Sequence, residues 1–447
     1  MALSGIEIFK LLPRTNCKDC GFPTCLAFAM SLAQGKTELA KCPHVSEQAK
    51  AALSEASEPP IRTVNMKLDG SAVKAGGETV MFRHEKTFVS PPPLGLLVTD
   101  AMSDAEVDAR LGKVAELQYD RVGLTLGAEL VAVKETRGDA ARFAAVAARV
   151  AGSGCGLILA SSNPQILAAA LQVCGTRKPL LYAATASNVA LVGALAKEHG
   201  CPVAARAEGI EALAAVTEQL LKMGLKDLVI DPGSPSLGAA LRDQIAIRRA
   251  ALSGKAKPLG FPTIAFAGEL TDDPQQEVVV ACALIAKYAG IVILSDFDGA
   301  ALFPLLLERM NIFTDPQRPM ATAQGIYEIG GPNESSPVLI TSNFSLSYFI
   351  VSGEIETSRV PAYLLVKDTE GLSVLTAWAA GKFVADEIAP FVQKCGIADK
   401  VQHRKLVIPG YAAQISGELE EELPGWEIVI GPREAAHIPA FLRAWKA

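Results

Sequence analysis

Thr-Asn-Cys-Lys-Asp-Cys-Gly-Phe-Pro-Thr-Cys, at residues 15–25, is the stretch that decides how the chain begins to fold. With a later cysteine that precedes a proline, it has the spacing C-x2-C-x4-C-x16-C: Cys17, Cys20, Cys25 and Cys42. Four thiolates so close in sequence can hold one metal centre. The spacing favours a four-iron, four-sulfur (4Fe-4S) cluster. The alternatives are a tetrahedral structural zinc, which usually uses two C-x2-C pairs, and cysteines without a ligand.

The residues around these cysteines predict two short helices. Ser4 and Glu7 form a capping box that opens the first helix, and Pro13 ends it. A second, apolar helix starts at Cys25 and stops before Gly35. A thiolate in the first turn of a helix is stabilised by the helix dipole and by free backbone N–H groups, which suits a metal ligand.

The composition is that of a soluble α/β protein with two or three domains. The chain has 447 residues, of which half are apolar and 20% are charged. No apolar stretch is long enough to cross a membrane and no signal peptide is present, so we expect a cytoplasmic protein. A net charge of −6 without a long basic run argues against nucleic acid as a partner. The remaining cysteines are expected to be buried in a reducing compartment: Cys155, Cys174, Cys201, Cys282 and Cys395.

A linker rich in proline and glycine separates the cysteine region from the rest of the chain. We expect a short Ala-rich helix at 46–54, followed by a segment with the alternation of β-strands. The expected strands are 61–68 and 79–89, the turns are at Gly70 and Gly76-Gly77, and the Pro-rich hinges are 59–60 and 91–93. This pattern predicts one or two hairpins that lie against the next domain.

From Leu94 to Met310 a short apolar strand followed by an Ala-rich helix recurs eight times. The expected strands are 94–99, 121–126, 156–160, 180–184, 202–206, 227–231, 263–267 and 291–295. Continuous apolar strands that alternate with helices indicate a parallel sheet covered by helices. Eight such units in this length predict a (β/α)8 (TIM) barrel.

Polar residues follow the barrel strands at their carboxyl ends, where the active sites of such barrels lie. They are Asp100, Asn163, Asn188, Asp231, Glu269 and Asp296. They could line a pocket for a polar small molecule such as a pterin, or they could cap the following helices and form turns. We favour caps and turns, because these residue types are typical of both.

From Gln324 onward a second strand–helix pattern predicts a small doubly wound α/β domain. The expected strands are 338–341, 363–366, 405–408 and 427–430. Each strand ends in small or polar residues: Thr341-Ser342-Asn343, Gly371-Leu372-Ser373, Gly410-Tyr411-Ala412 and Gly431-Pro432. Ligands of doubly wound sheets bind where such turns converge, and glycines let a large flat ligand approach the backbone. Because the chain has no G-x-G-x-x-G motif there, a dinucleotide is disfavoured.

Over essentially its whole length the chain resembles the large (gamma) subunit family of the corrinoid/iron–sulfur protein of the acetyl-CoA decarbonylase/synthase pathway. The most specific matches are residues 15–25 with Cys42-Pro43, and Glu-Gly-Leu-Ser-Val-Leu-Thr-Ala-Trp at 370–378. The resemblance implies four parts: a 4Fe-4S domain at 1–58, a hairpin linker at 59–93, a TIM barrel at 94–323 and a corrinoid-binding α/β domain at 324–447.

The resemblance also implies which residues hold each cofactor. The four N-terminal cysteines would ligate the 4Fe-4S cluster. The corrinoid would be lined by Thr341, Ser342, Asn343, Ser347, Gly371, Leu372, Ser373, Val374, Thr376, Gly410, Tyr411, Ala412, Gly431, Pro432, Arg433 and Glu434. No Asp-x-His-x-x-Gly loop is present, in agreement with a family whose cobalt has no protein histidine. We expect an uncharged side chain below the cobalt, with Thr376 as the candidate.

The function that the resemblance implies is that of a methyl carrier, the carrier subunit of a methyltransferase system. The corrinoid cobalt(I) would accept a methyl group from a methyl-tetrahydropterin on a separate methyltransferase and deliver it to acetyl-CoA synthase/CO dehydrogenase. The 4Fe-4S cluster would reduce cobalt(II) after accidental oxidation. A small subunit would complete a heterodimer. Two alternatives remain: a barrel methyltransferase that binds the pterin itself, and an iron–sulfur electron-transfer scaffold.

Overall fold

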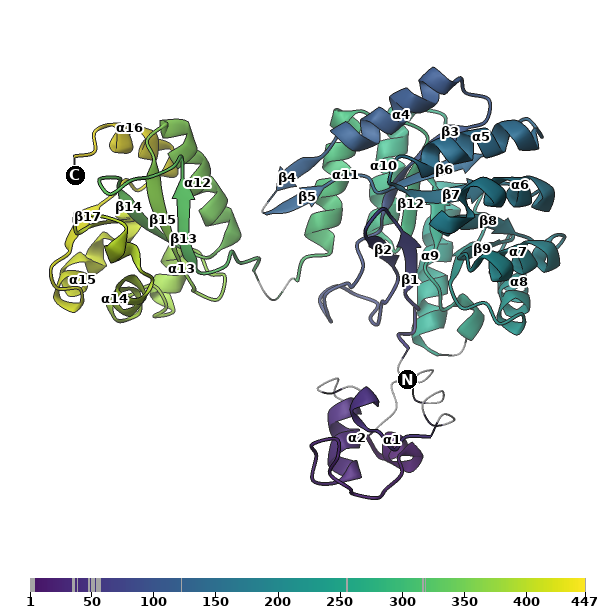
Figure 1. The fold of residues 1–447 in the computed structure, drawn as a ribbon, viewed down its shortest axis with the longest axis horizontal. Helices are drawn as coiled ribbons and strands as arrows, with labels where there is room; N and C mark the ends of the chain where they lie inside the picture. The colour runs from purple at the N-terminus through teal and green to yellow at the C-terminus, as the bar shows by residue number, and fades with distance from the viewer. Residues whose placement is uncertain are drawn as a thin grey trace. The chain divides into compact units, whose positions relative to one another are not determined.

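The computed structural model describes residues 5–33, 37, 39–46, 49, 53, 58–121, 123–254, 256–315, 317 and 319–446. The chain forms two compact units (Figure 1), one of Met1–Tyr119 with Leu126–Phe313 and one of Asp120–Thr125 with Thr314–Ala447. Ser4, Gly35 and most of the helix expected at 46–54 lie outside the described residues. In the described parts of the chain, no helix is both long and apolar enough to span a bilayer.

The described N-terminal residues include two short helices and one turn. Helix α1 spans Gly5–Leu11, α2 spans Cys25–Ala33, and the 3-10 turn η1 spans Leu39–Lys41. The predicted start of α2 at Cys25 is confirmed, and the Thr24 hydroxyl accepts a hydrogen bond from the Ala27 N–H in its first turn. Ile8 and Phe28 pack with the two buried cysteines in a small core of their own.

The linker contains a hairpin, as expected, but its second strand lies at 72–75, where no strand was predicted. Strand β1 (Val64–Lys67) pairs antiparallel with β2 (Ala72–Ala75), with Gly70 at positive φ in the turn. The buried side of the hairpin packs on the inward-facing residues of the barrel. The Asp69 N–H donates to the carbonyl of Gly154, two residues before the barrel strand that begins at Gly156. The hairpin therefore covers the amino end of the barrel interior.

The strand predicted at 79–89 is wrong, because side chains take the backbone groups that a strand partner would use. The Glu85 carboxylate accepts the N–H groups of Met81 and Phe82. The Glu78 carboxylate accepts the N–H groups of Val89 and Ser90. The segment is held as a series of turns.

Two buried arginines fasten this segment to the barrel. Arg248 lies 3.2 Å from the Glu78 carboxylate and donates to the Val80 carbonyl. Arg309 pairs with Glu129 at 2.8 Å and donates to the Pro92 carbonyl. The Pro-rich border at 91–93, expected to be a hinge, is thus packed against the barrel.

Eight parallel strands form the barrel, and the prediction of a (β/α)8 fold is confirmed. The strands are β3 (Leu94–Thr99), β6 (Leu130–Lys134), β7 (Gly156–Ala160), β8 (Leu180–Ala184), β9 (Val203–Arg206), β10 (Leu228–Asp231), β11 (Ile264–Phe266) and β12 (Ile291–Leu294). Their order is β10-β9-β8-β7-β6-β3-β12-β11. A parallel bridge from Ile230 to Thr263 joins β10 to the start of β11 and closes the sheet.

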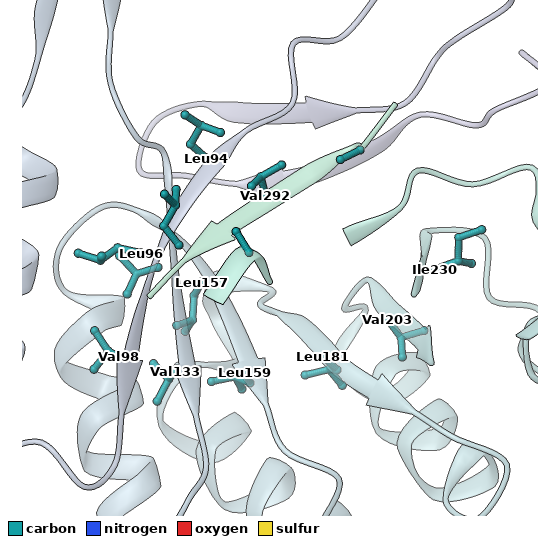
Figure 2. Packing of buried hydrophobic residues seen from close by; sticks show 14 of the residues in the cluster. Leu94, Leu96, Val98, Val133, Leu157, Leu159, Leu181, Val203, Ile230 and Val292 are labelled. Atoms are coloured by element: carbon teal, nitrogen blue, oxygen red, sulfur yellow. The ribbon is translucent and has the colours of Figure 1, made fainter. Parts of the chain in front are cut away.

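Helices surround this barrel on its outer side (Figure 1). They are α4 (Asp104–Glu116), α5 (Ala140–Ala151), α6 (Pro164–Cys174), α7 (Val189–His199), α8 (Ile210–Lys222), α9 (Leu237–Leu252), α10 (Pro274–Ala286) and α11 (Gly299–Ile312). Short 3-10 turns follow some of these elements: η2 (Gly175–Arg177), η3 (Lys257–Leu259) and η4 (Ala267–Glu269). Figure 2 shows the layer of aliphatic side chains that the strands bury, among them Leu96, Val133 and Leu159.

The strand predicted at 121–126 is wrong, and the second barrel strand is β6. Residues 119–126 form a separate two-stranded sheet of β4 (Tyr119–Arg121) and β5 (Leu124–Leu126). Its side chains are largely exposed, whereas those of β6 are nearly all buried. A central parallel strand is buried on both faces, so the continuous apolar run of β6 fits the barrel better.

The second unit is a doubly wound α/β domain, as predicted. Its strands are β13 (Gly325–Ile329), β14 (Val338–Ser342), β15 (Ala362–Lys367), β16 (Lys405–Ile408) and β17 (Glu427–Ile430), in the order β13-β15-β14-β16-β17. The four predicted strands are parallel, and β13 is an antiparallel edge strand that the sequence analysis missed.

Helices cover both faces of this sheet. The elements are α12 (Ser345–Ser358), α13 (Val374–Ala379), α14 (Ala385–Lys394), η5 (Ile397–Asp399), η6 (Gly410–Ile415), α15 (Ser416–Glu422), η7 (Ala435–His437) and α16 (Ile438–Arg443). Alternate strand residues divide between two cores: Ile340 packs with α13–α15, and Leu339 packs with α12 and α16. This alternation follows from the two-residue repeat of a strand.

Candidate functional site

Three of the four N-terminal cysteines lie at helix ends or in turns. Cys25 is the first residue of α2, and Cys42 follows the η1 turn, where its N–H donates to the Leu39 carbonyl at 3.1 Å. Both are buried, whereas Cys17 is exposed and Cys20 is half-buried. Cys20 lies in a turn closed by the Gly21 N–H and the Lys18 carbonyl at 2.8 Å.

The backbone around Cys17 alternates in the sign of φ. Arg14, Asn16 and Lys18 all have positive φ, at 59°, 50° and 68°. Alternating backbone of this kind turns successive N–H groups toward one point and forms anion-binding hollows that occur in many iron–sulfur sites. The Asn16 N–H lies 3.4 Å from the Cys25 sulfur, and the Asn16 side chain accepts the Cys25 N–H at 2.8 Å. These two hydrogen bonds hold Cys25 against Asn16.

Zinc fits the arrangement less well. A tetrahedral zinc with bonds of about 2.3 Å brings its ligand atoms within about 4 Å of one another. Among the residues that the structure describes, the group with such spacing is Cys17, Asp19 and His44, with ligand atoms within 4.8 Å. It uses one of the four thiols and is exposed. The hydrogen bonds from His44 and then Cys17 lower the pKa of the Asp19 carboxyl.

A cleft of about 270 Å³ opens at the carboxyl ends of the strands in the C-terminal unit. Neighbouring strands β14 and β16 connect to opposite sides of the sheet, so the gap between them is the topological switch point where such domains bind ligands. The predicted corrinoid residues that line it are Thr341, Ser347, Ser373, Val374, Tyr411, Gly431, Pro432 and Arg433.

The sequence analysis missed the apolar part of this lining. It comes from strand ends and helix faces: Leu339, Ile340, Ile350, Val351, Leu375, Val407, Ile408, Pro409, Ala435 and Ile438. Ile350 and Val351 could have been found, because they lie three and four residues after Ser347 and so share its face of α12.

Exposed apolar side chains gather on the segments that follow these strands. In described residues 319–446, the exposed large hydrophobics are Leu346, Ile350, Leu375, Trp378, Tyr411 and Ile430, each 40–51% exposed. Ile430 is the last residue of β17, and the others lie on segments that directly follow β14, β15 or β16. All of these strands end at the edge of the sheet where the cleft lies. An apolar surface concentrated at one edge of a domain marks a binding surface.

The other predicted corrinoid residues do not line the cleft: Ser342, Asn343, Gly371, Leu372, Thr376, Gly410, Ala412 and Glu434. Thr376 is exposed, with its hydroxyl 3.0 Å from that of Ser373. Glu434 accepts a hydrogen bond from the Tyr411 hydroxyl at 2.6 Å, which raises the pKa of that phenol. The buried Ser342 hydroxyl makes no hydrogen bond within the described chain.

Asn343 organises the loop that carries Ser373 to the cleft. Its buried side-chain oxygen accepts the N–H of Thr369 at 3.0 Å, the Thr369 hydroxyl at 3.0 Å and the N–H of Gly371 at 2.9 Å. Its amide nitrogen donates to Asp368 at 2.8 Å. Because its side-chain hydrogen bonds go to this loop, Asn343 positions the site.

The glycines at the strand ends are required by the protein backbone itself. A side chain on Gly410 would approach the Gly431 carbonyl to 2.6 Å. Gly371 has a φ of +75°, and a side chain there would meet the Pro319 carbonyl at 3.0 Å. Close packing of the turns therefore requires glycine at these two positions, whether or not a ligand approaches them.

The polar residues at the barrel strand ends divide into two groups. Asn163 caps α6, Asp100 accepts the Thr136 N–H, and Asn188 accepts the Thr185 N–H, as expected for caps and turns. Asp296 accepts a hydrogen bond from Lys113 at 2.7 Å. Asp231 and Glu269 instead form ion pairs with Arg206 and Lys134, which come from other strands. These two basic residues were not predicted from the sequence.

Comparison with known proteins gives the following similarities. A family model described as "CO dehydrogenase/acetyl-CoA synthase delta subunit" matches residues 63–442, and one described as "Putative Fe-S cluster" matches residues 12–44. The corrinoid/iron–sulfur protein large subunit of Moorella thermoacetica is 44% identical over 99% of both chains. The acetyl-CoA decarbonylase/synthase complex subunit gamma of Methanopyrus kandleri is 35% identical over 98% of this chain and 97% of that one.

Proposed function

This chain belongs to the family of corrinoid/iron–sulfur protein large subunits and acetyl-CoA decarbonylase/synthase gamma subunits, and from that premise we propose that it is a methyl carrier. It binds a corrinoid in the C-terminal cleft and a 4Fe-4S cluster on Cys17, Cys20, Cys25 and Cys42. When bound, the corrinoid supplies the cobalt that carries the methyl group, and the cluster supplies the electron that keeps this cobalt reactive.

The observation that carries the corrinoid proposal is the apolar edge around the cleft. Exposed Ile350, Leu375 and Tyr411 line the cleft and would contact a large flat ring. Burying such side chains contributes about 25 cal/mol per Å² of apolar surface removed from water. The hydroxyls of Thr341 and Ser373 lie in the same lining and can hydrogen-bond the polar groups at the ring's rim. These residues hold and orient the ring.

At the N-terminus, neighbouring backbone groups surround the sulfur atoms that would ligate the cluster. The Asn16 N–H donates toward the Cys25 sulfur, and Cys25 lies at the positive end of the α2 dipole. Burial of Cys25 and Cys42 limits contact of their thiolates with water. Such donors and burial are the means by which a protein adjusts the potential of a cluster.

The proposal includes three partners. A small subunit forms the heterodimer, in keeping with the name "large subunit" of the Moorella relative. A methyl-tetrahydropterin methyltransferase supplies the methyl group, and acetyl-CoA synthase/CO dehydrogenase receives it. We further propose a cytoplasmic protein whose parts correspond to residues 1–58, 59–93, 94–323 and 324–447.

Metal analysis tests the proposal. Protein prepared with its small subunit without oxygen should hold about one cobalt and about four irons per chain after incubation with cobamide. Iron without cobalt would support the electron-transfer scaffold instead. Absence of both metals would refute the methyl carrier. Replacing Cys20 with alanine should abolish reductive reactivation of oxidised protein while pre-reduced protein still accepts a methyl group.

A charge placed in the cleft tests the corrinoid site. Ile350→Asp should lower cobalt content several-fold and leave iron unchanged, because an ionised carboxylate against the ring would be desolvated. Ile350 is 47% exposed, so the substitution spares the core. Val279→Asp, at a 64% exposed position on α10, is the matched control. Equal cobalt content in the two variants would contradict the site.

The alternative, a barrel that binds the methyl-pterin itself, predicts a different activity. The subunit pair would then transfer methyl groups from methyl-tetrahydropterin to free cobalamin without an added methyltransferase. The cavity at the carboxyl end of the barrel keeps this alternative open to test. A rate no higher than that of a protein-free control would exclude it.

A further inference from the structure

A second cavity, of about 210 Å³, lies at the carboxyl ends of the barrel strands. Four charged residues line it: Lys134 at the end of β6, Glu135 directly after it, Arg206 at the end of β9 and Glu269 in η4. The rings of Tyr182 and Phe266, with centroids 4.8 Å apart, form its apolar wall. This is the end at which (β/α)8 proteins bind small molecules, and residues from several strands converge there.

Arg206 is held in place at this mouth by acidic groups. Its Nε donates to Asp231 at 3.2 Å, and the Tyr182 hydroxyl donates to the same oxygen at 2.5 Å. Asp231 is almost completely buried, and burial raises the pKa of its carboxyl. Glu269 lies 3.8 Å from the Arg206 guanidinium and 2.8 Å from Lys134. The geometry of the guanidinium is therefore fixed before any ligand arrives.

The two basic side chains of the cavity keep donors that make no hydrogen bond within the described chain. In the described chain, Arg206 makes a hydrogen bond through Nε, while its two terminal nitrogens make none. The Lys134 ammonium donates one hydrogen bond, to Glu269. The carboxylates nearby accept hydrogen bonds as well: Asp231 accepts from two side chains and from the Gly233 N–H, and Glu135 accepts from the Gly138 N–H. A ligand with acceptor atoms and a negative charge can therefore pair with Arg206 and Lys134.

We propose that this cavity binds the anion of a small carboxylic acid that carries an apolar group. The two terminal nitrogens of Arg206 form a fork that matches the two oxygens of a carboxylate. Lys134 adds a second positive charge, and the apolar group lies against Tyr182 and Phe266. The Glu269 carboxylate competes for both cations, so removing its charge should strengthen binding. The site requires neither proposed cofactor and would stand if the methyl-carrier proposal failed.

Calorimetric titration of the full chain with benzoate tests this site. Benzoate joins a carboxylate to a ring, whereas benzamide lacks the charge, benzylamine reverses it and inorganic phosphate lacks the ring. We expect benzoate to bind more tightly than all three. Arg206→Met should weaken benzoate binding about tenfold or more, as expected for loss of a charged hydrogen-bonded pair. Glu269→Gln should strengthen it about threefold or more.

The opposite signs of the two variants separate binding from folding, because a misfolded protein cannot gain affinity. Arg249→Met, at an exposed arginine of α9, is the matched control and should bind benzoate like the parent protein. No benzoate binding, equal binding of benzamide or phosphate, unchanged binding by Arg206→Met in a protein with parental melting temperature, or weaker binding by Glu269→Gln would each overturn the proposal.

Discussion

Replacing Asn343 with alanine should unfold the C-terminal unit at markedly lower denaturant concentration. Asn343 is 4% exposed, and its side-chain oxygen accepts the N–H groups of Thr369 and Gly371 together with the Thr369 hydroxyl. Alanine leaves the two N–H groups buried without a partner, while the hydroxyl keeps its bond to the Leu372 carbonyl.

The expected loss follows from these groups. Each buried unsatisfied N–H costs about 1–3 kcal/mol, so two of them cost about 2–6 kcal/mol, and entry of water moves the value toward about 3 kcal/mol. With a urea slope of about 2 kcal/mol per M, the midpoint should fall by about 1.5 M. The loop that carries Ser373 should also lose its conformation, so cobalt content should fall with stability.

Tryptophan fluorescence isolates this transition. The chain has three tryptophans, Trp378, Trp426 and Trp445, and all lie in the C-terminal unit. Unfolding of cofactor-free protein followed by their emission therefore reports this unit without the barrel. The matched control is Asn333→Ala, because Asn333 is exposed and accepts the Ser335 N–H at 3.0 Å, a bond that water can replace.

The control should shift the midpoint by less than about 0.5 M, equivalent to less than about 1 kcal/mol. If Asn343→Ala shifts the midpoint no further than Asn333→Ala does, the loop is not held by this side chain. The assignment of Asn343 as a positioning residue would then be refuted.

Two further predictions concern the barrel unit. Arg248→Met should destabilise it by about 3–5 kcal/mol, because the substitution leaves the Glu78 charge buried without its partner. Thermal unfolding followed by circular dichroism should show a lower melting temperature. A variant as stable as the parent would contradict the role of Arg248 in holding the linker on the barrel. Burial raises the pKa of Cys174 to about 11 and those of Cys201 and Cys282 to about 12, so these thiols should resist alkylation at pH 8 in folded protein and begin to react only as the pH approaches these values. Mass spectrometry of iodoacetamide-treated protein measures this, and rapid labelling at pH 8 would show the burial to be wrong.

Much of the fold could be predicted because its signal is local. The alternation of apolar strands with helices located seven of the eight barrel strands and the four parallel strands of the C-terminal sheet. The exception was 121–126, chosen over Leu130–Lys134. Both stretches are short and apolar in part, and only closure of the barrel shows which one is buried on both faces.

The cleft could be located from the sequence better than its lining. The turns after β14, β15, β16 and β17 were expected to converge, and residues from each of them line the cleft. The choice of side chains within each turn was less successful, since Asn343 and Gly371 serve the loop itself. Which side chain of a turn faces a cleft depends on backbone angles set by partners distant in the chain.

What the sequence determined by itself is what depends on near neighbours: the cysteine spacing, the helix starting at Cys25 and the periodicity of strands and helices. The tertiary structure decided which polar strand ends act as caps and which converge. Lys134 and Glu269 are 135 residues apart and meet at 2.8 Å only because the barrel closes. Hydrogen bonds and ion pairs form between groups that are close in space, and closure of the chain into a barrel chooses those neighbours.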